Sequence, residues 1–214
     1  MSRPSSRYER LLRDTHGYLR IAGVDEVGCG CLAGPVVAAA VILPSPARLP
    51  GLNDSKLVSA KARETLSEHI KSIAVWAIGV STVEEIDALG IRPATLLASK
   101  RALLALSQPP DAVISDAFFL PDLPFPCHPL VRADQQVRAV AAASIIAKVY
   151  RDQLMHEEAE QFPEFGFDQH KGYGTLQHLK TLKRLGPTPL HRTSFAPVRE
   201  AMELLASKVA AKLA

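Results

Sequence analysis

The chain has 214 residues, of which 47% are hydrophobic and 22% are charged; this balance is typical of a folded protein with a substantial core. The composition excludes a wholly disordered tail, a coiled-coil rod and a collagen-like polymer. A net charge of +3 identifies no partner by itself. The longest nearly apolar run, residues 31–43, is interrupted by Gly34 and Pro35 and is shorter than the ~18–20 residues of a membrane span. The N-terminus is too charged for a secretory signal, so we expect a cytoplasmic protein.

Hydrophobic periodicity and turn signals predict alternating helices and strands along the chain. The predicted strands are residues 18–24, 36–43, 74–81 and 112–115. The predicted helices are residues 8–15, 60–70, 83–89, 93–106, 135–161, 175–185 and 197–214. Proline-rich residues 121–129 and glycine-flanked residues 166–174 are predicted loops. The pattern indicates an α/β fold, with a mixed sheet in the main part and a helical extension at the C-terminal end.

The three cysteines, Cys29, Cys31 and Cys127, form an odd and sparse set that suits a reducing compartment. Together with His128 they could form a zinc site, but Cys29 and Cys31 are separated by one residue and Cys127 and His128 are adjacent, spacings tighter than zinc sites usually show. We therefore interpret them as small buried thiols.

Carboxylates follow two of the predicted strands. Asp25 and Glu26 come after the apolar residues IAGV, and Asp116 comes after AVIS. Each could lie in a solvated turn, and Asp134 could be the N-cap of the long helix. If the four converge, they need counter-charge, and a cluster of oxygen ligands binds Mg²⁺ or Mn²⁺ rather than zinc. Enzymes that cleave a phosphodiester by in-line displacement commonly use two such ions.

The glycines after Glu26 admit two interpretations. Gly28, Gly30 and Gly34 approximate a dinucleotide-binding fingerprint, but that motif opens a helix and here a predicted strand follows. We favour a turn whose bare backbone lets a polar ligand approach Asp25 closely.

Positive charge gathers toward the C-terminal end. Residues 169–200 contain one acidic residue, Glu200, and six cations: Lys171, Lys180, Lys183, Arg184, Arg192 and Arg199. Such a patch suits a polyanion such as nucleic acid, or it is simply a solvated helical face. Lys180, Lys183 and Arg184 fall within about 100° of arc on the predicted helix, opposite Leu182 and Leu185.

Several long blocks of the sequence closely resemble bacterial ribonuclease HII. They are GVDEVGCGCLAGPVVAAAVIL, LNDSKLVSAKARE, AAASIIAKVYRD and FGFDQHKGYGTLQHLKTLKRLGPTPLHRTSFAPVR, in this order. The resemblance implies a ribonuclease-H-like fold, with residues 1–160 as the catalytic domain and residues 161–214 as a helical substrate-binding extension. It also implies a divalent-metal endonuclease that acts on RNA–DNA hybrids and incises 5′ of single ribonucleotides in duplex DNA, leaving 3′-hydroxyl and 5′-phosphate ends.

The resemblance also assigns site residues. Asp25, Glu26, Asp116 and Asp134 match the family's four catalytic, metal-binding acids, which hold two Mg²⁺ or Mn²⁺ ions. The tripeptide Gly28-Cys29-Gly30 matches the segment whose backbone reads the 2′-hydroxyl, the one group that distinguishes RNA from DNA at a single nucleotide. Tyr173 matches the tyrosine that packs against the sugar at the DNA–RNA junction, although an aromatic residue at such a place is often a rim or core residue. We expect phosphate contacts from Asn53, Ser55, Lys56, Ser144, Lys148, His170 and Lys171; for Lys148 the alternative is a lysine whose stem lies along an apolar helix.

The chain departs from the family pattern at three places. The tripeptide usually has arginine at its centre, where this chain has Cys29, and this puts phosphate anchoring or junction selectivity in doubt. The third acid is usually followed by Gly-Asn and here by Ala117-Phe118, which changes the support of the metal site. The fourth acid is usually preceded by Lys-Gly and here by Arg132-Ala133, which keeps a cation.

Two alternative functions follow. Ribonuclease HIII shares the acids but carries a substantial N-terminal domain, whereas only twenty-four residues precede Asp25 here. A non-catalytic binder of RNA–DNA hybrids is favoured by the departures at Cys29 and Ala117-Phe118. The sequence gives no reason to expect an oligomer or a membrane partner, and it leaves open whether the C-terminal residues bind a replication clamp.

Overall fold

The computed structural model describes residues 3–213 and divides into two compact units. The first, which we call the sheet unit, comprises Met1–Val27, Val37–Val80 and Thr95–Tyr150. The second, the helical unit, comprises Gly28–Val36, Ser81–Ala94 and Arg151–Ala214. The chain therefore leaves the sheet unit and returns to it twice. This organisation differs from a single division at residue 160, because two earlier segments belong with the C-terminal residues.

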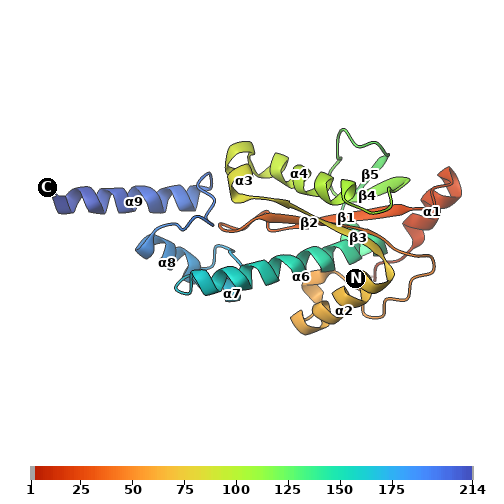
Figure 1. Ribbon diagram of the computed structural model, residues 1–214, viewed down its shortest axis with the longest axis horizontal. Coiled ribbons are helices and arrows are strands. Elements are labelled where there is room, and N and C mark those ends of the chain that lie inside the picture. The colour runs from red at the N-terminus through yellow and green to blue at the C-terminus, as the bar shows by residue number, and fades with distance from the viewer. Residues whose placement is uncertain (1–2, 214) are drawn as a thin grey trace. The chain divides into compact units, whose positions relative to one another are not determined.

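The sheet unit is built on the mixed sheet that the sequence predicts. Its strands are β1 (Ile21–Val27), β2 (Val36–Ile42), β3 (Val75–Ser81), β4 (Ala112–Asp116) and β5 (Cys127–Leu130). Their order across the sheet is β3-β2-β1-β4-β5. The β1–β2 pair is antiparallel, and β1–β4 and β4–β5 are parallel (Figure 1). The carboxyl ends of β1 and β4 therefore meet at one edge of the sheet.

Strand β5 overlaps the end of the proline-rich segment predicted to be a loop, so that prediction is wrong for residues 127–129, while residues 121–126 form no helix or strand. The strand is short and contains Pro129, which hides its period-2 pattern. It occupies an edge of the sheet, and an edge strand tolerates proline because one side of its backbone needs no ladder bonds.

Most helices agree with the predicted ones in place and differ at their ends, but the prediction of a loop over residues 166–174 is wrong at the short helix α7. The helices are α1 (Arg7–His16), α2 (Ala60–Ile73), α3 (Val83–Leu89), α4 (Ile91–Leu104), α5 (Ala133–Gln136), α6 (Arg138–Gln161), α7 (Phe167–His170), α8 (Leu176–Leu185) and α9 (Ala196–Leu213), with a 3₁₀ turn η1 at Ser55–Leu57. The predicted helix over residues 135–161 is divided, because Val137 is extended and separates α5 from α6. No helix among residues 3–213 is long and apolar enough to cross a bilayer.

Helices cover the sheet closely at glycines and alanines, and Figure 1 shows α4 and α6 on opposite sides of the strands. A Cβ atom at Gly23 of β1 would lie 2.2 Å from the carbonyl carbon of Ala139 in α6. Residues 139–143 of α6 are fully or almost fully buried, which agrees with a helix that is apolar on nearly every face. The backbone of α6 thus packs directly against β1, the strand that contains two of the candidate acids.

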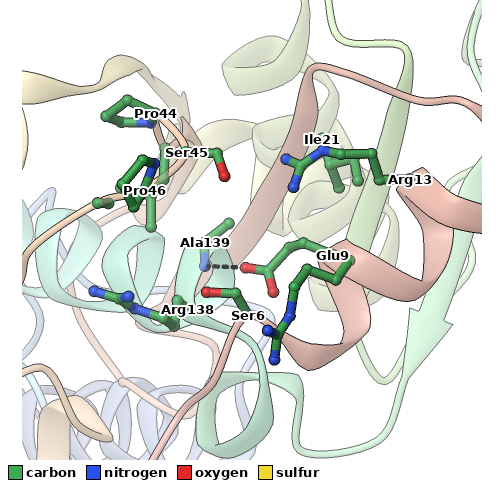
Figure 2. Close-up of a pocket in the computed structure, with 12 residues that line it drawn as sticks. Ser6, Glu9, Arg13, Ile21, Pro44, Ser45, Pro46, Arg138 and Ala139 are labelled. Atoms are coloured by element: carbon green, nitrogen blue, oxygen red, sulfur yellow. Dashed lines mark hydrogen bonds between the residues drawn. The ribbon is translucent and has the colours of Figure 1, made fainter.

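The start of α6 is also fixed by a buried carboxylate. Glu9 of α1 is 7% exposed, and its Oε1 accepts a hydrogen bond from the Ala139 N–H at 3.2 Å. Its Oε2 is buried and has no hydrogen-bond partner within the described chain. Figure 2 shows this carboxylate at a cavity of about 260 Å³ between α1, residues 43–47 and the first residues of α6. The cavity lies beside Ile21, at the opposite end of β1 from Glu26.

We predict that Glu9→Gln becomes progressively more stable than the wild-type protein as pH rises above 4.5, the ordinary pKa of a glutamate. Burial raises the pKa of Glu9, although Ala139 N–H, Arg138 and Arg13 favour its charged form. The folded wild-type protein therefore binds more protons than the unfolded chain over this range and loses stability as pH increases. Glutamine keeps an acceptor for Ala139 N–H and does not titrate. Urea unfolding at several pH values measures the difference.

The matched control is Glu64→Gln, which changes an exposed carboxylate of α2 and should show no such trend. A stability difference between Glu9→Gln and the wild-type protein that is constant with pH would contradict the prediction.

Candidate metal and substrate site

Two of the candidate acids come together because their strands are parallel neighbours. The register pairs Val24 of β1 with Ser115 of β4, so Asp25 and Asp116 are the next residues along each strand. Strand β1 continues to Val27, and Asp25 and Glu26 therefore lie within the strand and not in a turn after it. Asp25 is 7% exposed. This excludes the solvated-turn alternative for Asp25.

The fourth acid is brought to the same place by a short helix. Asp116 Oδ1 accepts a hydrogen bond from the Ala133 N–H at 2.9 Å, next to Asp134 in the chain. Asp134 is buried and lies in the first turn of α5. The N-cap position is occupied by Arg132, so the interpretation of Asp134 as a helix N-cap is wrong. Its carboxylate is available to the cluster instead.

The electrostatics of the acids show their proximity. Burial raises the pKa of Asp25 well above its ordinary value, and the charges of Glu26, Asp116 and Asp134 add to this. Burial and then the charge of Asp116 raise the pKa of Glu26 to about 7. Burial, Asp116 and Asp54 raise the pKa of Asp134. Buried like charges disfavour ionisation, so this edge of the sheet has an unmet demand for positive charge.

The donor set fits a hard divalent ion by its chemistry. All four side chains offer carboxylate oxygens, which Mg²⁺ and Mn²⁺ prefer and which do not favour zinc. Within residues 3–213, no three His, Cys, Asp or Glu side chains are already arranged as the ligands of one ion. The acids therefore lie within electrostatic reach of one another, and side-chain rotation is needed to bring three of them onto one ion.

A network of hydroxyls and one further acid supports the cluster. Ser144 of α6 hydrogen-bonds to the carboxylate of Asp25, and its Oγ lies 3.0 Å from Ser55 Oγ. Both serines are buried. In this structure the two hydroxyls bond to each other, and that of Ser144 also bonds to Asp25; phosphate contacts from Ser55 and Ser144 remain a prediction.

Asp54 was missed by the sequence reasoning. It is buried, and its two oxygens accept hydrogen bonds from the Lys56 N–H at 3.0 Å and from Gln135 Nε2 at 3.3 Å. Its charge also raises the pKa of Asp134. Its position between Asn53 and Ser55, both predicted to contact phosphates, is the feature of the sequence that could have indicated a role for Asp54.

The other predicted phosphate contacts of the sheet unit differ in exposure. Lys56 is exposed, and its charge lowers the pKa of both Glu26 and Asp134. Lys148 and Asn53 are half-buried, and Asn53 Oδ1 accepts a hydrogen bond from the Asp54 N–H at 3.0 Å. Among these three residues, Lys56 is the cation best placed to meet an anion beside the acids.

The glycine segment belongs to the helical unit, and its two candidate glycines have different surroundings. Gly28 is buried with φ of +98°, and a Cβ atom there would lie 2.3 Å from Arg151 Nε. Gly30 is exposed, and a Cβ atom there would meet nothing within 4 Å. Gly28 is thus required by internal packing, whereas only Gly30 leaves open space for a ligand.

Tyr173 lies beside this segment. It forms an isolated bridge with Cys31 and is 41% exposed. The Leu32 N–H also donates to Gly172 O at 2.8 Å. Within the helical unit, backbone contacts therefore hold the glycine segment next to the segment of Tyr173. These are the two segments that the family resemblance implies contact the sugar.

The histidines of this region are structural. His170 is 9% exposed; its Nε2 lies 2.7 Å from Phe165 O, and its Nδ1 accepts a hydrogen bond from the Gly172 N–H at 3.2 Å. It stacks on His178 with ring centroids 4.3 Å apart. Both ring nitrogens of His170 have partners within the protein, and a phosphate contact from this residue remains a prediction. Lys171 is half-buried and its Nζ donates to Asp168 O.

The basic patch is smaller than the sequence suggests. Lys180, Lys183 and Arg184 of α8 are exposed opposite the buried Leu182, as predicted. Leu185, expected on the buried face, is 45% exposed, and Arg192 is fully buried. The exposed stripe on α8 and the exposed Arg199 are the parts of the patch that can meet a polyanion.

The cysteines are free thiols. Cys31 is buried, and Cys127 Sγ lies 3.5 Å from Ser115 Oγ. No zinc-like group of ligands is present in the part of the chain that the structure describes.

Comparisons with known proteins identify the family of the chain. A family model described as Ribonuclease HII matches residues 22–198. The ribonuclease HII of Syntrophotalea carbinolica is 51% identical over 193 residues, which cover 90% of this chain and 91% of that protein. Among solved structures, ribonuclease H2 from Pyrococcus horikoshii has a TM-score of 0.77 at 26% identity and covers 86% of this chain and 98% of its own.

A structure of the PCNA:RNase HII complex from Archaeoglobus fulgidus gives a TM-score of 0.68 at 29% identity, covering 81% of this chain and 92% of that chain. With a family match over most of the chain, close sequence relatives and a shared fold, the chain belongs to the ribonuclease HII family, endonucleases that degrade the RNA of RNA–DNA hybrids.

Proposed function

We propose that this protein also incises duplex DNA on the 5′ side of a single embedded ribonucleotide, using two Mg²⁺ or Mn²⁺ ions and leaving 3′-hydroxyl and 5′-phosphate ends. The observation that carries the proposal is the cluster of Asp25, Glu26, Asp116 and Asp134 where β1 and β4 end, in which burial and the neighbouring carboxylates raise the pKa of Asp25, Glu26 and Asp134. Bound divalent ions would supply Lewis acidity and generate hydroxide near neutral pH.

The residues of the chain have separable tasks in this proposal. Asp25 is oriented by the Ser144 hydroxyl, and Asp116 by the Ala133 N–H. Such hydrogen bonds hold carboxylates in place and limit their rotation. Asp25, Glu26, Asp116 and Asp134 would hold the ions. Lys56, exposed near the acids, would meet the substrate backbone as a positioning contact.

Recognition of the ribonucleotide is proposed for the helical unit. Gly30 offers an exposed, unobstructed backbone, and Tyr173 offers a partly exposed aromatic ring. A ribose 2′-hydroxyl can both donate and accept a hydrogen bond, and it is what marks RNA at one nucleotide. The exposed cations of α8 would contact phosphates without reading sequence.

Three further properties of this protein remain predictions: binding to a replication clamp, a monomeric state and a cytoplasmic location. The Archaeoglobus fulgidus relative was solved as a complex with PCNA. For this chain, clamp binding would involve the C-terminal residues, of which Ala214 lies outside the described part.

The first test is Asp25→Asn with duplex DNA that contains one ribonucleotide. We expect cleavage to fall by about a thousandfold or more, because the amide cannot supply the charge that holds the ions, while duplex binding persists or tightens. Single-turnover cleavage with Mg²⁺, with an EDTA arm, measures the first effect, and a gel shift in EDTA measures the second. Asp14→Asn, an exposed acid of α1, is the control.

Retained activity of Asp25→Asn with Mg²⁺ would contradict the mechanism. A wild-type gel shift without a metal-dependent nick would instead indicate a non-catalytic hybrid binder.

A second test measures metal binding without activity. Millimolar Mn²⁺ or Mg²⁺ should raise the Tm of the wild-type protein by about 2–5 °C, because an ion that binds only the folded state stabilises it. Asp25→Asn should lose most of this rise and Asp14→Asn should keep it. An equal rise in all three proteins would place the ions elsewhere.

A third test compares one substitution at two glycines. Gly30→Ala should keep the wild-type Tm, since its Cβ meets nothing in the free protein, yet lose about tenfold or more in cleavage at a single ribonucleotide. Gly28→Ala should instead lose about 2 kcal/mol of stability or more, because its Cβ would lie 2.3 Å from Arg151 Nε at a positive φ. Full activity of Gly30→Ala would remove Gly30 from the substrate contact.

A further inference from the structure

Two arginines of the helical unit are completely buried, and the sequence reasoning assigned neither a role inside the protein. Arg151 and Arg192 are both 0% exposed. Burying an arginine is costly unless its N–H groups are bonded. Burial lowers the pKa of Arg192 to about 10, so its guanidinium still carries a charge at neutral pH. The partners of these two guanidiniums therefore show what their burial achieves.

The side-chain hydrogen bonds of Arg192 within the described chain go to carbonyls of the glycine segment. Its Nε and Nη2 donate to Gly34 O at 2.9 and 2.7 Å, and its Nη1 donates to Cys29 O at 3.2 Å. The planar fork of the guanidinium thus spans both ends of the turn. Carbonyl dipoles take the place of a carboxylate partner.

Arg151 holds the rest of the same segment. It donates to Pro35 O at 3.0 Å, to Ala33 O at 3.0 Å and to Lys171 O at 2.8 Å. Lys171 lies two residues before Tyr173. The two arginines therefore fix the backbone of the glycine segment from its inner side and connect it to the tyrosine segment.

The contact with Cys29 O determines where the next N–H points. The Cys29 carbonyl and the Gly30 N–H belong to one peptide group, which is trans, since the cis bond of the described chain is Ser45-Pro46. In a planar trans peptide the C=O and N–H point in opposite directions. With the carbonyl turned toward the buried Arg192, the Gly30 N–H points away from it.

That N–H is free to bind a ligand. Gly30 is exposed, and its N–H donates no hydrogen bond to the described part of the chain. A free backbone donor on a surface is unremarkable, but here the direction of the donor is set by a buried charge with three hydrogen bonds.

We propose that Arg192 is a positioning residue: by holding Cys29 O it directs the Gly30 N–H outward as a donor to the 2′-hydroxyl of the ribonucleotide, while Arg151 fixes the flanking backbone. The inference rests on the proposed function, because it assumes that this segment contacts the ribose. Arg192 contacts only the backbone carbonyl of residue 29. The proposed role of Arg192 therefore does not depend on the side chain at this position, which is cysteine here.

The test measures affinity for two duplexes that differ by one 2′-hydroxyl. Fluorescence anisotropy in EDTA gives the Kd for DNA with a single ribonucleotide and for the same all-deoxy DNA. In Arg192→Lys the charge remains, but one ammonium cannot reach both Gly34 O and Cys29 O in the same way. We expect the preference for the ribonucleotide duplex to fall about three- to tenfold, the value of one neutral hydrogen bond, with the all-deoxy Kd unchanged.

Arg92→Met is the control, since Arg92 is an exposed arginine of the helical unit, and it should keep the wild-type preference. Gly30→Pro deletes the same N–H with Arg192 intact and should show the same loss of preference, which keeps the test decisive if Arg192→Lys does not fold.

Several outcomes would overturn the inference. A folded Arg192→Lys protein, or Gly30→Pro, with the wild-type preference would overturn it alone and leave the proposed function in place. Equal weakening for both duplexes would assign Arg192 a structural role only. A wild-type protein that nicks ribonucleotide duplexes but shows no preference in binding would also refute it, whereas a wild-type protein that does not nick would refute the proposed function first.

Discussion

Four carboxylates held within electrostatic reach of one another at one edge of a sheet are the constraint on which the rest of the structure depends. Burial and mutual repulsion raise the pKa of Asp25, Glu26 and Asp134. Such an arrangement costs stability in the absence of a cation. The fold maintains it with the parallel β1–β4 register, the Asp116–Ala133 bond and the Ser144 hydroxyl. A site that holds like charges together in this way is suited to recruit the ions that a phosphodiesterase needs.

The elements that the sequence predicted well are those with strong local signals. The strand β2 follows from a continuous apolar run that is buried along its whole length, and the helix α3 has the predicted bounds. β5 was missed because four residues with an internal proline carry no such pattern. The division of α5 from α6 was missed because the extended Val137 lies in a run that is otherwise helical in character. That break places Asp134 on its own short turn, so a local detail decides the geometry of the site.

The sequence predicts which kinds of residue form the site, but it does not predict whether each side chain is buried or exposed. The sequence predicts phosphate contacts from Asn53, Ser55 and Lys56, but only the fold shows that Ser55 and the intervening Asp54 are buried while Lys56 is exposed. The cationic stretch at the C-terminal end posed the same problem. Its sequence reads as one patch, yet Arg192 is an internal support and the lysines of α8 are on the surface. The positions of charged residues in a sequence do not show which of them are buried. A buried guanidinium can be satisfied by backbone carbonyls, and every residue has one, so its partners cannot be recognised from residue types.

The departures from the family pattern have physical explanations in this structure. Ala117 has a φ of 61°, the left-handed region where an L-residue costs roughly 1 kcal/mol or more; this conformation explains why glycine usually follows the third acid, and alanine here accepts the strain. Cys29 replaces the usual arginine at the centre of the tripeptide, but its carbonyl is held from behind by Arg192. The side chain of residue 29 and the direction of its peptide are therefore independent. Loss of the arginine side chain removes a charge from the surface and leaves the orientation of the backbone donor intact, which is why this departure is compatible with the enzyme's family rather than evidence for a non-catalytic binder.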